Sequence, residues 1–542
     1  MKKLKVLLIL GLVLALFTGC SSSSDGGDGE TTKKILTVAT DTDLSTMDQN
    51  IATDGTSFIA IQACISGLTQ LDADGVVLPE LAETWDVVFN DDGTTVYTFH
   101  LADANWSNGT PVTAADFVFD WQRLADPATA SEYNFIVSTI KLHNADAVIA
   151  GEMPVDQLGV KALDDKTLEV TLDLPVDFFL SLMAFPTFFP LNEEFYLAQG
   201  DQYAVTPANI LACGPYVMTE WISGNSFTFE KNETYFKADD VQIDGITFKY
   251  IQDTQSAMLE FESGNLDYVK LSGELVEAYS DDDEFVQRLQ GYLWYLSINF
   301  NDESINSVNL RKAISTVINR ESIAVNILKD GSIAAEGIVP KLLATGPDGK
   351  DYRTTAAVLV TTDITQAQAY WQAAKVDLGV DTLNIELLFE DTEASKAVAE
   401  FIQSEIETNL EGLTVTLKSQ PKKSRLELMR SGDYQIGLHR WGPDYADPQT
   451  YLDLFLTDNN NAGYSSVAYD ATVLEATTGE TAKDSTARWA MLKEAERILL
   501  EDDCAVVPIY QNGGALMISS KVHGIELHTV GIDSFARVTI DD

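Results

Sequence analysis

Residues 383–448 decide the fold class: LNIELLFEDTEASKAVAEFIQSEIETNLEGLTVTLKSQPKKSRLELMRSGDYQIGLHRWGPDYADP. This stretch contains three short apolar runs typical of strands, at 383–389, 413–417 and 434–438. Between them lie two segments with helical apolar spacing, 393–410 and 424–429, which end before Gly412 and Gly432. The alternation of strands and helices predicts an α/β fold with a parallel sheet and right-handed crossovers.

The segment directly after the third run, 439–448, is the first candidate site. In parallel sheets ligands bind beyond the carboxyl ends of the strands, so we expect this segment to be a loop that faces a ligand. Trp441 and Tyr445 offer large amphipathic faces, and Asp444 and Asp447 carry negative charge. An enclosed carboxylate needs a cation or several N–H donors, and a ligand ammonium can be that cation. A surface turn with solvated aspartates is the alternative.

Working outward, the same reasoning predicts further elements. They are strands at 35–40 and 96–101 and helices at 57–68, 113–124 and 310–318. The helix at 113 has a capping-box start, because the Thr113 hydroxyl can accept from the amide of Asp116 while the Asp116 carboxylate reaches back.

Composition excludes several classes of protein. The chain has 542 residues, of which 45% are hydrophobic and 22% charged, an ordinary globular balance that excludes fibres, wholly disordered chains and polytopic membrane proteins. Its length predicts two to four packed units. With 35 basic against 83 acidic residues, the formal charge of −48 repels phosphate backbones, so no nucleic-acid partner is expected.

The sequence contains no recognisable catalytic or metal-binding motif. GxSxG, HExxH and Walker patterns are absent, and the five histidines and four cysteines lack metal-ligand spacing. We therefore expect no enzyme, no metal and no cofactor, and we interpret Cys64, Cys213 and Cys504 as small buried side chains. Paired carboxylates could support glycoside hydrolysis, but among 83 acidic residues such pairs arise by chance.

The first residues predict export. Basic residues precede the apolar run 6–17, whose 12 residues are too few to span a bilayer of about 30 Å. The small residues Thr18 and Gly19 follow, so residues 1–19 are predicted to be a secretory signal peptide.

The segment 17–20, Phe-Thr-Gly-Cys, resembles a bacterial lipobox, although Phe17 stands where the pattern usually has Leu. The resemblance implies cleavage before Cys20 and its acylation. Residues 20–34 are predicted to form a flexible tether, because most of the residues after Cys20 are small or polar. We expect a body held by lipid at the extracellular face of a bacterial membrane; an ordinary secreted protein is the alternative.

Five regions, in order along the chain, resemble the family 5 extracellular solute-binding proteins, the oligopeptide- and dipeptide-binding receptors of ABC importers. The matching residues are PELAETW at 79–85, WSNGTPVTAAD at 106–116, CGPY at 213–216 with NETY at 232–235, NLRKAI at 309–314 with INR at 318–320, and WGPDYADP at 441–448. Cys213 departs from the usual Thr, and Gln49 stands where Pro is common.

The resemblance implies a two-lobed periplasmic-binding-protein-like fold of type II, hinged around a central cleft and carrying an extra domain. Its expected parts are a discontinuous lobe I (35–77, 205–292 and 508–542), the extra domain (78–204) and lobe II (293–507).

The same resemblance implies a function. The protein would capture extracellular oligopeptides as a monomer and deliver them to an ABC permease with its ATPase subunits. Extended peptides bind such clefts through main-chain hydrogen bonds. By resemblance Asp444 holds the α-ammonium of the peptide, and Trp441 and Tyr445 line the pocket. The predicted site also includes His439, Arg440 and Gly442, and from lobe I the facing loop Asp54, Gly55 and Thr56.

Three alternatives remain at this point. The same fold could bind a nickel chelate, heme or an oligosaccharide, or it could serve as a peptide-pheromone receptor. A secreted carbohydrate-active hydrolase is the alternative from another class; it would need two carboxylates about 5–9.5 Å apart in the cleft.

Overall fold

The computed structural model describes residues 33–457 and 459–541. The predicted signal peptide, Cys20 and most of the predicted tether lie outside this range. Across the described residues, no helix combines the length and the apolar character needed to cross a membrane.

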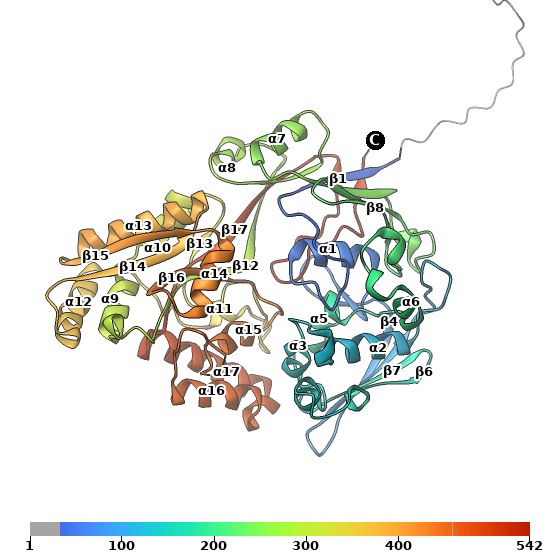
Figure 1. Ribbon diagram of the computed structural model, residues 1–542, viewed down its shortest axis with the longest axis horizontal. Coiled ribbons are helices and arrows are strands. Elements are labelled where there is room, and N and C mark those ends of the chain that lie inside the picture. Colours follow the sequence, from blue (N-terminus) through green and yellow to red (C-terminus); the bar gives the residue numbers. More distant parts are fainter. Residues whose placement is uncertain (1–32, 458, 542) are drawn as a thin grey trace, which may run out of the picture. The chain divides into compact units, whose positions relative to one another are not determined.

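The central element is an 11-stranded mixed sheet (Figure 1). In spatial order its strands are β15 (Leu413–Gln420), β14 (Leu383–Glu390), β16 (Ile436–Trp441), β12 (Phe285–Ile298), β17 (Val506–Ile518), β11 (Tyr268–Leu271), β1 (Ile35–Thr40), β10 (Gly245–Tyr250), β9 (Ser226–Lys231) and β8 (Tyr216–Ile222), with β13 (Ile333–Ala334) paired to β17. Strand β14 pairs in parallel with β15 and β16, and β1 pairs in parallel with β10 and β11.

The predicted strand–helix alternation is confirmed. Helix α13 (Glu393–Asn409) connects β14 to β15, and α14 (Lys422–Ser431) connects β15 to β16 and ends at Gly432 in the left-handed conformation. One expectation is wrong: residues 439–441 are not loop but the end of β16. They continue the strand because β12 supplies an antiparallel edge, where Trp441 pairs with Leu293. The loop therefore begins at Gly442.

Strands β12 and β17 run side by side through the centre of the sheet (Figure 1). Their register shifts twice. Leu289 faces Gly513 and Leu293 faces Gln511, so residues 290–292 bulge opposite residue 512 alone. Trp294 then faces Tyr510 and Tyr295 faces Pro508, so residue 509 is extra on β17. The expected lobe boundaries at 292/293 and 507/508 fall inside these two strands.

Most elements before β12, together with residues near the end of the described chain, contribute to one large core. A second, four-stranded sheet contributes to it, in the order β4 (Ala82–Phe89), β5 (Thr95–Leu101), β7 (Thr167–Leu172) and β6 (Val160–Asp164). Helix α2 (Ala114–Ala125) carries the predicted capping box of Thr113 and Asp116. Its buried face packs into the same core.

Helix α1 (Gly55–Cys64) is shorter than the predicted helix 57–68. It ends at Cys64 because the Cys64 carbonyl accepts hydrogen bonds from the backbone amides of Cys213 and Gly214. These two residues are about 150 positions away in sequence, so the apolar spacing of 57–68 cannot reveal this contact. Gly67 is not a helix stop; a Cβ there would lie 2.4 Å from the Met183 carbonyl oxygen.

The elements after β12 cover both faces of the β14–β16 region. On one face pack α9 (Val308–Val317), α12 (Ile364–Leu378) and α13. On the opposite face α14 packs against β14, and α16 (Val467–Thr477) and α17 (Ser485–Arg497) pack against β12 and β17. Alternation along β16 sends Leu438 into the first core and Trp441 toward the second.

The remaining helices and strands are short. They are β2 (Thr69–Leu71), β3 (Val77–Pro79), α3 (Phe135–Thr139), α4 (Ala145–Ile149), α5 (Phe179–Leu182), α6 (Glu193–Gln199), α7 (Thr254–Glu262), α8 (Glu274–Tyr279), α10 (Arg320–Ser322), α11 (Tyr352–Thr355), α15 (Gln449–Leu452), β18 (Val522–His523) and β19 (Thr539–Ile540).

Candidate functional site

A cavity of about 410 Å³ lies where three parts of the chain meet. Before β12 it is lined by Gln62 of α1, by residues 71 and 73–75, and by residues 181, 182, 184 and 185. Residues 342–345, Asp351 and 444–446 line it from the segment between β12 and β17, and residues 528–532 line it after β17. Segments far apart in sequence thus enclose one space.

Asp444 stands in the wall of this cavity. Its Oδ1 accepts a hydrogen bond of 3.2 Å from the hydroxyl of Tyr133, and its amide donates to Thr450 Oγ1 at 3.1 Å. Within the described parts of the chain, no Lys, Arg or His forms an ion pair with it. Burial raises the pKa of Asp444 to about 6, although the Tyr133 hydrogen bond opposes this shift. The site therefore contains a carboxylate that lacks a cation.

Asp447, three residues further on, is a structural residue. Its two carboxylate oxygens each accept from the Arg488 guanidinium at 2.8 Å, and both side chains are buried. The ion pair raises the pKa of Arg488, despite the opposing effect of burial. The two aspartates of the segment, which look equivalent in sequence, therefore differ in chemistry.

His439 does not face the cavity. Its ring lies edge-on to Tyr295, and its Nδ1 accepts from the Arg425 guanidinium at 2.8 Å. Burial, and then the neighbouring charges of Arg425 and Arg440, lower the pKa of His439 to about 3. It is a neutral residue packed on the sheet.

Arg440 projects from the other face of β16. Its guanidinium carbon lies 5.3 Å from the ring centre of Tyr292 and 5.4 Å from that of Trp294, both in β12. This arrangement is typical of a cation held between aromatic faces. Arg440 does not line the cavity of 410 Å³.

Trp441 and Gly442 shape the start of the loop without lining the cavity. Trp441 packs against the core beside α17, and its buried Nε1 has no hydrogen-bond partner in the described portion of the chain. At Gly442 a Cβ would lie 2.3 Å from the ring of Tyr292, so this close approach requires glycine. The bulged residues of β12 are thus in direct contact with the loop that carries Asp444.

Tyr445 lines the cavity and is buried at its edge. Its ring stacks on that of Phe178, with 4.3 Å between ring centres and 15° between planes. Nearby, Ser485 Oγ donates to Asp177 at 2.7 Å. With the Tyr133–Asp444 hydrogen bond, these contacts join residues 133–178 to residues 444–485.

The structure does not bring Asp54, Gly55 and Thr56 to the cavity. The Asp54 carboxylate caps α1 instead, accepting from the amide and the hydroxyl of Ser57 at 2.9 and 2.8 Å. From the same helix it is Gln62 that reaches the cavity.

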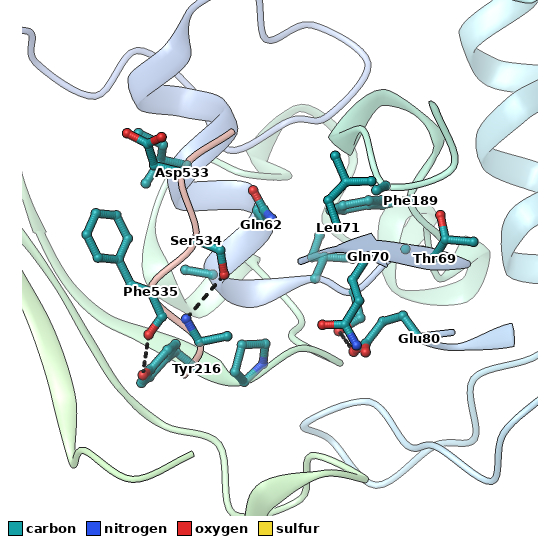
Figure 2. Close-up of a pocket in the computed structure, with 18 of the residues that line it drawn as sticks. Gln62, Thr69, Gln70, Leu71, Glu80, Phe189, Tyr216, Asp533, Ser534 and Phe535 are labelled. Carbon is teal, nitrogen blue, oxygen red and sulfur yellow. Dashed lines mark hydrogen bonds between the residues drawn. The ribbon is translucent and has the colours of Figure 1, made fainter. Parts of the chain in front are cut away.

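A second, smaller cavity of about 50 Å³ lies beside the first (Figure 2). Gln62, Leu71 and Ala184 line both cavities. Both carboxylates in its lining are already satisfied: Ser66, Tyr235 and Lys237 donate to Glu80 at 2.8, 2.5 and 2.6 Å, and Asp533 pairs with Arg288. This space therefore offers no uncompensated charge.

The structure also allows the predictions about the cysteines and about a metal site to be compared with the described residues. Cys64, Cys213 and Cys504 are buried free thiols, as expected, and burial raises the pKa of Cys64 to about 12. Among residues 33–457 and 459–541, no three His, Cys, Asp or Glu side chains are grouped as metal ligands would be.

Sequence reasoning missed the residues that complete the site. Tyr133, Phe178, Gln62 and the segment 528–532 carry no local pattern that distinguishes them from core or loop residues. Their position becomes evident only when the chain is folded.

Comparisons with known proteins identify the family. Residues 76–463 match the bacterial extracellular solute-binding proteins, family 5 Middle. The chain is 30% identical over 551 residues to the dipeptide-binding protein DppE of Bacillus subtilis (strain 168), and the alignment covers 98% of each protein.

Two solved structures are similar throughout. Listeria monocytogenes OppA bound to peptide is 33% identical, with a TM-score of 0.80, covering 94% of this chain and 100% of that one. The pheromone receptor PrgZ is 31% identical, with a TM-score of 0.81 and the same coverage. These similarities confirm the predicted two-lobed α/β fold. The chain therefore belongs to the bacterial extracellular solute-binding proteins of family 5.

Proposed function

We propose that this protein is the peptide-binding component of an ABC importer, and that Asp444 anchors the α-ammonium group of the peptide. One observation carries the proposal: a carboxylate in a cavity wall has a hydroxyl donor but no cationic partner among the described residues. A ligand ammonium is the natural complement of such a group. Relatives named for dipeptide and oligopeptide binding support this choice of ligand.

The rest of the peptide would lie along the cavity, with its main chain hydrogen-bonded to exposed backbone and its side chains in wet pockets. Tyr445 and Phe178 would close one side of the amino-terminal subsite.

Binding would be coupled to closure of two lobes. We take residues 35–77, 205–292 and 508–542 as lobe I, 78–204 as an extra domain and 293–507 as lobe II, with the hinge in β12 and β17. A peptide that contacts segments from both sides favours the closed arrangement by its differential affinity for that state.

We further propose that the protein acts at the extracellular face of a bacterial membrane. Acylated Cys20 would hold it there through the tether 20–34, and the monomer would deliver peptide to a permease and its ATPase subunits without cleaving it. Labelling with radioactive palmitate tests the anchor: wild type should be labelled and the Cys20→Ala variant should not.

Calorimetry with a free and an N-acetylated peptide tests the ligand. Asp444→Asn preserves shape but removes the counter-charge, so it should weaken binding by ~2–5 kcal/mol, roughly 30-fold to several thousand-fold. Acetylation should weaken binding to wild type similarly. The two changes should not add, because both remove one interaction.

The matched control is Asp484→Asn, an exposed helix cap that accepts from Ala487 and does not line the cavity. It should bind both peptides as wild type does. Asp447→Asn is unsuitable as a control because it would leave the buried Arg488 unpaired. Equal affinity of wild type for the free and the acetylated peptide would refute the role of Asp444.

The same binding chemistry could instead serve signalling, and one observation favours keeping this candidate: the pheromone receptor PrgZ is among the similar structures. Loss of peptide uptake in a deletion strain supports import. A changed transcriptional response to added peptide, with uptake intact, supports reception.

A further inference from the structure

The cavity that contains Asp444 is lined with carboxylates and without basic side chains of lysine or arginine. Asp74 and Asp351 join Asp444 in its wall, and the other lining side chains are apolar, small, or neutral polar, apart from one histidine. The 410 Å³ space is therefore surrounded by more negative charge than one α-ammonium can balance.

Several basic residues close to the lining already have carboxylate partners. Four such pairs are present: Arg288 with Asp533, Lys341 with Glu336, Arg353 with Glu496, and Arg488 with Asp447. None of these cations is available to neutralise Asp74 or Asp351, or to receive an acidic group of the ligand.

His528 does not present a ring nitrogen to the ligand. Its Nδ1 lies 2.7 Å from the Ile532 carbonyl oxygen and its Nε2 lies 2.9 Å from the Asp72 carbonyl oxygen. Both ring nitrogens are thus directed at the main chain, so neither is presented to a ligand.

The two additional carboxylates differ in accessibility. Asp74 is exposed at the turn between β2 and β3, and its carboxylate accepts no hydrogen bond from the described residues. Asp351 is partly buried and accepts from the backbone amides of Leu342, Arg353 and Thr354 at 2.8, 3.0 and 3.3 Å. Those hydrogen bonds fix the position of the Asp351 carboxylate in the wall.

From this arrangement we infer that the cavity selects basic peptides: beyond the α-ammonium held by Asp444, it receives a lysine or arginine side chain near Asp351 and Asp74. This inference rests on the proposed function and specifies its substrate class. Peptides with a glutamate or aspartate at the corresponding position are excluded, because an acidic side chain would meet like charge without a cation to receive it. The net charge of −48 attracts cations generally, but it cannot distinguish positions within one peptide.

Calorimetry on the full chain tests the inference with two tetrapeptide series, Ala-Xaa-Ala-Ala and Ala-Ala-Xaa-Ala, in which Xaa is lysine, norleucine or glutamate. Norleucine matches the length of the lysine stem without its charge. In at least one series, lysine should bind roughly tenfold or more tightly than norleucine, and glutamate should bind more weakly than norleucine. The lysine preference should shrink as salt is raised, because charge interactions are screened.

Two variants assign the preference to the named carboxylates. Asp74→Asn removes an exposed charge without removing a hydrogen bond, and Asp351→Asn retains a residue type that caps helices well. Each should reduce the lysine-to-norleucine ratio while leaving norleucine affinity nearly unchanged. Asp363→Asn is the matched control: it caps α12 by accepting from Gln366 at 3.0 Å and does not line the cavity, so its ratio should equal that of wild type.

The outcomes separate this inference from the proposed function. Binding of all three peptides with equal affinity, or a preference for glutamate, overturns the basic-peptide inference while peptide binding itself stands. An unchanged ratio in both Asp74→Asn and Asp351→Asn overturns it as well. Failure of all the peptides to bind, or binding that N-acetylation does not weaken, would count against the proposed function instead.

Discussion

The hydroxyl of Tyr133 donates a hydrogen bond to Oδ1 of Asp444 at 3.2 Å, although 311 residues separate the two in sequence. Tyr133 lies just before α3, and Asp444 lies just beyond β16. The contact joins two segments that must both be in place for the cavity to form. It also leaves the carboxylate with a neutral donor rather than a cation, so its charge remains available to a ligand.

Removing the Tyr133 hydroxyl should weaken ligand binding. In Tyr133→Phe the ring can keep its contact with Phe58, whose centre is 5.6 Å away, but the carboxylate loses its donor. A hydrogen bond to a charged group contributes about 1.5–3 kcal/mol, so we expect peptide affinity to fall roughly tenfold or more. Calorimetry measures the change. Wild-type affinity in Tyr133→Phe would show that the hydroxyl does not support the anchor.

Ligand affinity should depend on pH through Asp444. Because its pKa is raised to about 6, the carboxylate is charged above that pH and becomes neutral below it. A neutral carboxyl cannot balance an ammonium, so the dissociation constant should rise up to about tenfold per pH unit as the pH falls below 6. Titration calorimetry at pH 5, 6, 7 and 8 measures this slope. Asp444→Asn should remove it, and a slope that persists in this variant belongs to another group.

The same residue should reduce the stability of the ligand-free protein. Its folded pKa of about 6 lies above the ordinary value of 3.8, so the folded state holds the proton more tightly than the unfolded state. Stability from this group is greatest below pH 4 and is lost as the pH rises through 6. The loss at pH 8 is on the order of 3 kcal/mol.

Asp444→Asn should therefore raise the unfolding temperature of the ligand-free protein at pH 8 and have little effect at pH 4. Thermal unfolding followed by circular dichroism tests this. A variant less stable than wild type at pH 8 would contradict the expectation.

Asp447→Asn should have the opposite effect on stability. It leaves the Arg488 guanidinium buried without its carboxylate, which typically costs about 3–5 kcal/mol. Replacing both partners with apolar residues, as in Asp447→Leu with Arg488→Met, should recover much of the loss. Urea unfolding compares the three proteins. If the single variant unfolds at the same urea concentration as wild type, the pair does not stabilise this segment.

Gly442→Ala should displace the loop from the bulge of β12. The new methyl group would lie 2.3 Å from the ring of Tyr292, so either the loop or the ring must move. We expect weaker peptide binding, because the loop carries Asp444 two residues later. Tyr292→Ala should relieve the clash, so the double variant should bind better than Gly442→Ala alone. Additive losses in the two variants would rule out this contact as the cause.

Helices whose apolar spacing and capping residues lie close together in sequence could be predicted from the sequence alone. The apolar periodicity of 393–410 and the capping box at Thr113 correspond to α13 and α2 with small differences at the ends. The end of β16 could not be predicted in this way, because residues 439–441 are strand only by pairing with β12, more than 140 residues earlier.

The candidate site could likewise be predicted only in part. The parallel-sheet argument drew attention to Asp444, and the structure places that residue in the cavity wall. It could not separate Asp444 from Asp447, since the difference is made by Arg488 and Tyr133 from distant segments. Asp54 was misplaced because a short acidic turn looks the same whether it faces a ligand or caps a helix.

The position of β17 in the sheet constrains how the protein can be made. This strand lies between β12 and β11, and β11 in turn pairs with β1 at the beginning of the described chain. A growing chain that has not yet reached residue 518 therefore exposes two unpaired strand edges, which invite association with other chains. Pairings that join the two ends of a chain also form slowly, because a long loop must first be closed. The sheet can be completed only after residues 506–518 have been synthesised.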